Sequence, residues 1–288
     1  MDCAHPVPDA SRGERPLGIA FAMTAVIFVA EIVGGWWTGS LALLADAAHM
    51  GIDLAALGLG LAATHFSRKP PDSRRTFGYQ RVEVLAALAN AVSLLVVTGM
   101  ILREAFLRWL NPTPVLAIPM IAVAVVGLAC NATSGMLLYG ASRENINLRG
   151  VFLHVISDLL GSLGVIAGGL VMLATGWQGA DPIASVLICG IVIFTSVMLF
   201  RDSVHILLEG APTHLDLDEI RAALSGLPGV REVHDLHLWS LSKGSESLSG
   251  HLVLDAGGEQ GAVLKAGTEL LRARFGLNHV TLQIESET

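Results

Sequence analysis

Residues 41–64 read LALLADAAHMGIDLAALGLGLAAT, and within this apolar run only Asp46, His49 and Asp53 carry ionisable side chains. At 1.5 Å of rise per helical residue, a run of this length spans the hydrocarbon core of a bilayer, which is about 30 Å thick. The stretch therefore predicts a membrane-spanning helix that carries ionisable groups inside the hydrocarbon.

Five further apolar runs of similar length flank this one. The chain has 288 residues, of which 15% are charged, and its mean hydropathy is +0.61. Buried core helices of a large soluble protein are the alternative, but the first 210 residues show no alternating strand pattern beside the six runs. We predict an all-α six-span transmembrane bundle over residues 17–210. Its other spans are Leu17–Trp37, Val82–Leu107, Val115–Tyr139, Val151–Ala174 and Pro182–Phe200. The polar residues 1–16 lack the apolar core of a cleavable signal peptide, so they are predicted to form a cytoplasmic tail.

The distribution of Lys and Arg predicts the orientation of the bundle, because cytoplasmic loops carry an excess of both. With the N-terminus inside, the outer side receives only Arg103 and Arg108. The tryptophans near the span ends fall at the same outer edge, as an interfacial aromatic belt requires. Both termini are therefore predicted to be cytoplasmic. The tryptophans are Trp36, Trp37, Trp109 and Trp177, and the inner basic residues are Arg12, Arg15, Arg68, Lys69, Arg74, Arg75, Arg81, Arg143, Arg149 and Arg201.

Residues 211–288 have the composition of a small soluble domain. Their periodicity changes between helix and strand in the order α-β-β-α-β, which predicts a cytoplasmic α+β domain of the ferredoxin-like type. The expected elements are Asp216–Leu227, Glu232–Leu241, Glu246–Asp255, Glu259–Phe275 and Asn278–Glu285.

Strict alternation along the strands assigns side chains to the two faces of this sheet. It places Leu236 beneath the helices, and His234 with it, so His234 is expected on the opposite face from His251. His237 and Trp239 would lie on the open face. An exposed Trp beside histidines suggests a surface for self-association.

Two His/Asp pairs lie inside the predicted spans. His49 and Asp53 lie on the second span, and His154 and Asp158 lie on the fifth. Inserting an ionisable side chain at the bilayer centre costs about 2.5–3.5 kcal/mol of free energy, so each such residue is expected to have a functional or structural role. The i, i+4 spacing directs both members of a pair from one helix face. Two facing helices then offer four N and O ligands, which suit tetrahedral Zn²⁺, whereas imidazole disfavours Mg²⁺ and Ca²⁺.

Two other interpretations of these pairs stay open at this point. Histidine–aspartate hydrogen bonds can simply hold helices together, and the groups can form a proton relay without metal. Further polar residues within the spans, namely Glu31, Asp46, Asn90 and Asn131, are candidates for lining a water path or for interhelical hydrogen bonding. Asp46, nearly one turn before His49, is a candidate vestibule residue.

Four motifs resemble those of the cation diffusion facilitator family, and together they cover nearly the whole chain. They are Gly39-Ser-Leu-Ala-Leu-Leu-Ala-Asp-Ala-Ala-His-Met-Gly-Ile-Asp53, Arg75-Thr-Phe-Gly-Tyr-Gln-Arg-Val-Glu83, His154-Val-Ile-Ser-Asp158 and Val233-His-Asp-Leu-His-Leu-Trp239. The resemblance implies a homodimeric secondary transporter of bacterial type in the cell membrane, with no enzymatic activity and no organic cofactor. Its tetrahedral site would be His49, Asp53, His154 and Asp158. The two histidines resemble the zinc branch, which exports Zn²⁺ against protons, with Cd²⁺, Co²⁺ and Ni²⁺ as further candidate ions. No nucleic-acid partner is expected.

The resemblance also implies auxiliary features. Some relatives hold regulatory metal in the cytoplasmic domain and in the loop after the second span. Here the candidate ligands are His234, His251 and Glu285 in the domain, with Gln283 where those relatives have a further His, and His65 and Asp72 in the loop. At the inner membrane edge, Arg81 and Glu209 carry opposite charges and are predicted to form an interlock between the two domains.

Two competing functions follow from the same residues. A passive metal channel needs weak sites along a continuous wet path, which a four-ligand site does not provide. A membrane metal sensor would need the cytoplasmic domain but neither of the paired intramembrane motifs. Proton-driven metal transport in reconstituted vesicles discriminates among the three functions.

Overall fold

A computed structural model describes residues 11–51, 54, 72–142, 146–242, 244–255 and 258–286, with the backbone alone for 11–20, 137–142 and 146–157. The chain divides into two compact units. One takes in residues 1–58 and 90–198, and the other takes in residues 59–89 and 199–288.

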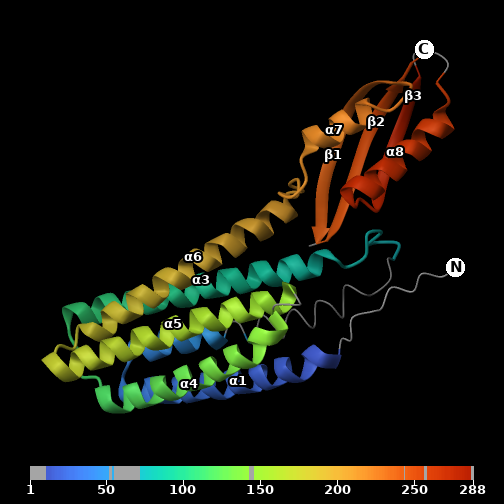
Figure 1. Cartoon of the computed structure of the whole chain (residues 1–288). Helices are drawn as coiled ribbons and strands as arrows, with labels where there is room; N and C mark the ends of the chain where they lie inside the picture. The colour runs from blue at the N-terminus through green and yellow to red at the C-terminus, as the bar shows by residue number, and fades with distance from the viewer. Residues whose placement is uncertain are drawn as a thin grey trace. The chain divides into compact units, whose positions relative to one another are not determined.

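Five helices of the described chain are long and apolar enough to cross a membrane (Figure 1). Large apolar side chains stand exposed along them, including Val26, Ile118 and Phe194 at 69%, 70% and 67%. Such surfaces suit contact with lipid, since hydrocarbon chains solvate them. The helices are α1 (Ser11–Thr38), α3 (Arg81–Leu110), α4 (Ala117–Ser142), α5 (Ile146–Thr175) and α6 (Ala180–Leu207).

A shorter apolar helix, Leu41–Gly51, follows α1. It forms the first part of the predicted second span, and most of the remainder, from Ile52 onward, lies outside the described residues. The predicted first, third, fourth, fifth and sixth spans each coincide with one of the five long helices.

Close packing positions the helices of the first unit. Helix α4 packs against both α1 and α5. A Cβ atom at Gly34 of α1 would come within 2.9 Å of Val123 on α4, so glycine permits this close approach. The buried apolar core includes Leu43, Met120 and Val165. This core holds the helix Leu41–Gly51 among its neighbours.

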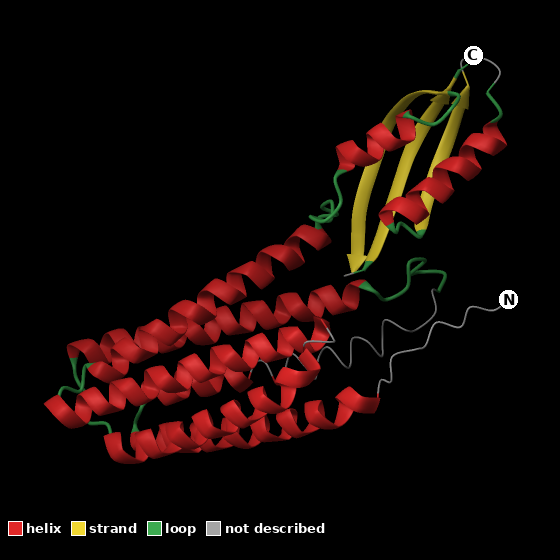
Figure 2. Cartoon of the chain, in the orientation of Figure 1, coloured by secondary structure: helices red, strands yellow, loops and turns green. Residues whose placement is uncertain are grey.

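The C-terminal part of the chain is an α+β domain with two helices on one face of a three-stranded sheet (Figure 2). Strand β1 pairs antiparallel with β2, and β2 pairs parallel with β3. The helices bury Ile220, Leu248 and Leu271 between themselves and the sheet. The elements follow the predicted α-β-β-α-β order: α7 (Leu217–Ser225), β1 (Val230–Ser242), β2 (Ser245–Leu254), α8 (Gln260–Phe275) and β3 (His279–Ser286).

A β-bulge in β1 contradicts the strict alternation expected from the sequence. The register between β1 and β2 shifts between His234 and His237, and Asp235 there has a φ of 48°. Val233 and Leu236 are consequently both buried, although they are three residues apart. The prediction that His234 lies on the opposite face from His251 is therefore wrong. An extra residue in one strand reverses which side chains face each side beyond it.

Candidate functional site

The structure brings together one member of each predicted His/Asp pair. His49 Nε2, on the helix Leu41–Gly51, lies 3.9 Å from Asp158 Oδ1 on α5. Their side chains are only 13% and 2% exposed. Asp53 lies outside the described residues, and His154 lies on the α5 backbone one turn before Asp158, with its side chain outside the described set.

Two further carboxylates are buried beside this pair. Asp46 is 1% exposed and Glu31 of α1 is 0% exposed. A Cβ atom at Gly161 of α5 would lie 2.5 Å from Asp46 Oδ1, so only glycine leaves room for the carboxylate at that point. One imidazole and three carboxylates from three helices are therefore buried in this region, and such groups bind divalent cations or protons.

Asp181, in the first turn of α6, fixes the start of the helix that carries His49. Its carboxylate is 0% exposed and accepts hydrogen bonds from Ser40 Oγ (2.6 Å), Leu41 N (2.8 Å) and Ala42 N (3.2 Å). Arg108 Nη1 lies 3.9 Å from Asp181 and donates to the carbonyl of Gly39. Sequence reasoning missed this role. The available signal was an acidic residue at a span end, opposite a Gly-Ser sequence that begins a helix.

The bulge in β1 gathers a second group of ligating side chains in the cytoplasmic domain. His234 pairs directly with His251 across β1 and β2, and their ring centroids are 5.2 Å apart. Glu285 on β3 accepts from both rings, with Oε2 3.1 Å from His234 Nε2 and Oε1 2.9 Å from His251 Nδ1. One ligand atom from each of the three residues lies within 4.8 Å of the others. We call this group the cytoplasmic trio.

Hydrogen bonding keeps Glu285 ionised. The bond from His234 is the main cause that lowers the pKa of this carboxyl below its ordinary value. The amide of Gln283 also donates to Glu285 Oε1, at 3.0 Å. Gln283, at the position where some relatives have a further His, therefore orients the Glu285 carboxylate and does not itself offer an imidazole ligand.

Asp72 shapes a turn in the segment before α3. Its Oδ1 accepts from the backbone N–H groups of Arg74 and Arg75 at 2.7 and 2.8 Å, and its Oδ2 accepts from the hydroxyl of Tyr79 at 3.0 Å. The bond from Arg74 is the main cause that lowers the pKa of Asp72. Both oxygens thus have partners in the turn, and His65 lies outside the described residues.

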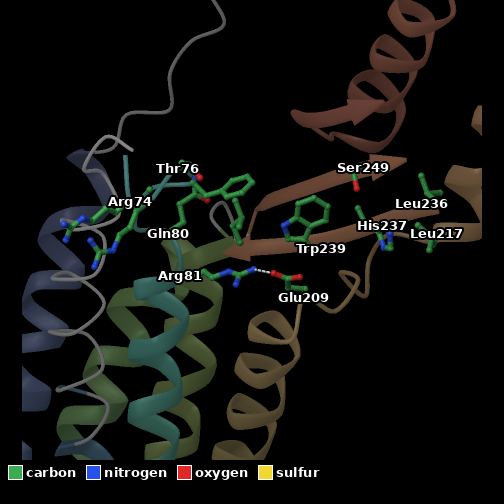
Figure 3. Close-up of a pocket in the computed structure, with 15 residues that line it drawn as sticks. Arg74, Thr76, Gln80, Arg81, Glu209, Leu217, Leu236, His237, Trp239 and Ser249 are labelled. Carbon is green, nitrogen blue, oxygen red and sulfur yellow. Dashed lines mark hydrogen bonds and ion pairs between the residues drawn. The ribbon is translucent and has the colours of Figure 1, made fainter. Parts of the chain in front are cut away.

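The predicted partners Arg81 and Glu209 form an ion pair, with Arg81 Nη2 3.0 Å from Glu209 Oε1 (Figure 3). The pair lies at the edge of a cavity of about 840 Å³ that Trp239 and Gln80 also line. Their side chains are 36% and 64% exposed, so the pair is well solvated. An exposed pair of this kind contributes about 0–1 kcal/mol to stability.

Curated relatives match nearly the full length of the chain. The metal cation efflux system protein CzcD of Cupriavidus metallidurans is 42% identical over 286 residues, which cover 99% of this chain and 90% of that protein. The zinc transporter ZitB of Escherichia coli is 42% identical over 94% of this chain and 87% of that protein. A cadmium, cobalt and zinc/H⁺–K⁺ antiporter of Bacillus subtilis is 37% identical over 95% of this chain and 89% of that protein.

One solved structure and two family descriptions complete the comparison. The structure is the metal-bound C-terminal domain of the Cupriavidus CzcD transporter, 35% identical over 25% of this chain and 99% of that domain, with a TM-score of 0.23. Residues 17–208 match the cation efflux transmembrane domain, and residues 212–287 match the cation efflux protein cytoplasmic domain. The chain therefore belongs to the cation efflux family, the cation diffusion facilitators that its motifs resemble.

Proposed function

We propose that this chain exports Zn²⁺ from the cytoplasm in exchange for protons, as a transporter and not an enzyme. The observation that carries the proposal is the approach of His49 Nε2 to Asp158 Oδ1, 3.9 Å apart between two apolar helices. Relatives of nearly full length are named as zinc transporters, and one is named as a proton-coupled antiporter. The family relationship and the buried pair thus point to the same chemistry.

The proposed transport site has four ligands: His49, Asp53, His154 and Asp158. Each His/Asp pair has i, i+4 spacing, so its two side chains leave one face of a helix. The site requires the second of six spans to continue from the helix Leu41–Gly51 toward Thr64, which carries Asp53 along the same helix. Two imidazoles and two carboxylates match the tetrahedral preference of Zn²⁺ and also admit Cd²⁺, Co²⁺ and Ni²⁺.

Proton exchange follows from the chemistry of the ligands. An imidazole must be neutral and a carboxylate ionised before either binds a metal ion, so zinc and protons compete for the site. Imidazoles in general titrate near pH 6.5, within the physiological range. His49 and His154 are therefore proposed as proton carriers as well as ligands.

The proposed arrangement in the membrane follows the positive-inside rule. Both termini lie in the cytoplasm of a bacterial cell, with residues 1–16 as a tail, 17–210 as a six-span domain and 211–288 as a cytoplasmic domain of ferredoxin-like type. At the opposite ends of the spans, Trp109 and Trp177 pack edge to face with ring centroids 6.2 Å apart. Exposed tryptophans at helix ends suit a bilayer interface.

The cytoplasmic domain is proposed to dimerise and to bind regulatory metal. In the bulged sheet, two imidazoles and one carboxylate of the cytoplasmic trio converge, which is a ligand set suited to Zn²⁺. Glu209 and Arg81 would connect movements of the domain to the start of α3. Asp72 is not part of this metal site, because its oxygens already accept hydrogen bonds within their turn.

Transport in proteoliposomes tests the function. The full chain is reconstituted with an imposed pH gradient, and uptake of Zn²⁺, Cd²⁺, Co²⁺ and Mn²⁺ is followed with internal fluorescent dyes. We expect zinc uptake that rises with the size of the pH gradient. We also expect protons to move in the direction opposite to the metal ions. Metal flux that runs only down its own gradient, with no associated proton movement, would instead indicate a passive channel.

A further inference from the structure

Glu31 is a buried acidic side chain that the proposed metal site does not use. It is 0% exposed in the second half of α1, and neither carboxylate oxygen has a hydrogen-bond partner among the described residues. An ionised carboxylate without donors is costly in a low-dielectric interior, and more so within a bilayer. Such a group is stable only when a proton or another cation neutralises it.

Helices α4 and α5 form a close-fitting space for this carboxyl. The point where a Cβ atom of Gly127 would sit lies 2.9 Å from Glu31 Oε1 and 3.7 Å from Ser162 Oγ. Glu31 and Ser162 thus face the same small gap, which exists because α4 has glycine there. Asp46 lies against Gly161, the residue before Ser162. The carboxyl groups of Glu31 and Asp46 therefore lie near consecutive residues of α5, Ser162 and Gly161 respectively.

Among the described residues, the charges that act on Glu31 are negative. The charges of Asp46, on the helix Leu41–Gly51, and of Asp158, on α5, act on it. Helix α4 contributes no charged side chain, and Cys130 is its one titratable group besides the tyrosine near its end. His49 is the titratable cation-forming group on the facing helix. Residues 17–51, 117–142 and 150–175 contain no Lys or Arg, so no permanent cation in these spans can neutralise Glu31.

We propose that Glu31 is a proton-binding site, distinct from the four metal ligands, that holds one of the protons exchanged for zinc. The inference rests on the proposed antiport function. When Zn²⁺ binds near Asp158, its two positive charges stabilise the ionised form of the nearby carboxyl. The O–H bond of Glu31 then breaks, its electron pair stays on the carboxylate and the proton leaves to water. When zinc departs, a proton returns and the cluster keeps its charge balance.

The test counts the protons that the full-length protein releases for each zinc bound, in weakly buffered detergent solution with a pH indicator. Glu31→Gln places a neutral side chain of the same shape at this position. We expect it to release about one proton fewer per zinc than wild type, and its zinc affinity should therefore rise less steeply with pH. Glu31→Asp, which keeps a carboxyl, should restore the proton count. The matched control is Glu269→Gln, at an exposed position of α8, and it should match wild type.

Several results would overturn the inference. An unchanged proton count in Glu31→Gln shows that the exchanged protons reside elsewhere. Zinc affinity that rises as steeply with pH in Glu31→Gln as in wild type likewise overturns it, because this slope counts the protons exchanged. If neither variant folds, infrared difference spectra of the wild type provide the test. A protonated-carboxyl band that does not decrease when zinc is added would overturn the proposal. Failure of the antiport function itself is distinct, because wild type would then move zinc in proteoliposomes with no associated proton movement.

Discussion

The carboxylate of Asp181 accepts a hydrogen bond from the backbone N–H of Leu41 at 2.8 Å. The first turn of α6 thus caps the first turn of the helix that carries His49. Free N–H groups at a helix start attract negative charge, and a buried acceptor there satisfies donors that the membrane interior would leave unpaired. Asp181 is therefore a positioning residue for the metal site.

Replacing Asp181 with Ala should lower stability by about 1–3 kcal/mol, because three hydrogen bonds to the helix start are lost. Zinc affinity should fall in parallel, since the helix that carries His49 loses its anchor. Thermal unfolding in detergent and zinc titration measure the two effects. Asp202→Ala changes an exposed Asp on the same helix and should alter neither. Equal melting temperatures for both variants would contradict the anchoring role.

Replacing Asp158 with Asn should abolish zinc transport while the protein still inserts in the membrane. The amide keeps the shape of the side chain but lacks the charge that a Zn²⁺ ligand needs. Asp53→Asn should behave in the same way. Zinc flux into proteoliposomes measures the effect, with Asp202→Asn as the matched control. Wild-type flux through either variant would refute the four-ligand assignment.

Replacing His154 with Asp should keep a metal site but change its pH profile. A carboxylate titrates well below an imidazole, so competition by protons moves to lower pH. Harder oxygen ligation should also raise the relative affinity for Mn²⁺ and alter that for Cd²⁺. Metal affinity measured between pH 5.5 and 7.5 tests both points. Superimposable zinc curves for variant and wild type would show that His154 neither binds the metal nor exchanges a proton.

Exchanging the charges of Arg81 and Glu209 tests the predicted interlock. Each single reversal, Arg81→Glu or Glu209→Arg, places like charges about 3 Å apart and should slow transport, with a stability change of about 1 kcal/mol or less. The double variant restores an opposite-charge pair and should recover most of the flux. Failure of the double variant to recover any flux, with both proteins correctly folded, would argue that the pair does not act directly.

Replacing His234 with Ala should remove one bound zinc per chain from the cytoplasmic trio. His237→Ala is the matched control on the same strand, because His237 bonds Asp235 and lies outside the trio. Since the bond from His234 lowers the pKa of Glu285, its stabilising effect is present at neutral pH. That effect is lost as pH falls through the lowered pKa. Zinc stoichiometry by equilibrium dialysis checks the first statement, and thermal unfolding at decreasing pH checks the second.

Local sequence patterns predicted much of this architecture. The apolar runs and the α-β-β-α-β order required only hydrophobic periodicity, and the described helices and strands follow them. Features that depend on tertiary contact were not predictable in this way. In the sequence, Asp181 resembles any acidic residue at the start of a helix. Its role depends on the hydrogen bond from Leu41, which is far away in sequence. Glu31 was one polar residue among several, and only its burial without donors distinguishes it from Asn90.

The bulge at Asp235 makes the cytoplasmic trio sensitive to a change that touches none of its ligands. Deleting this one residue would leave His234 opposite His251 in regular pairing, but it would remove the carboxylate whose Oδ2 lies 3.7 Å from His251 Nε2. A single codon deletion would thus change the charge beside a zinc ligand while every ligand stays in place.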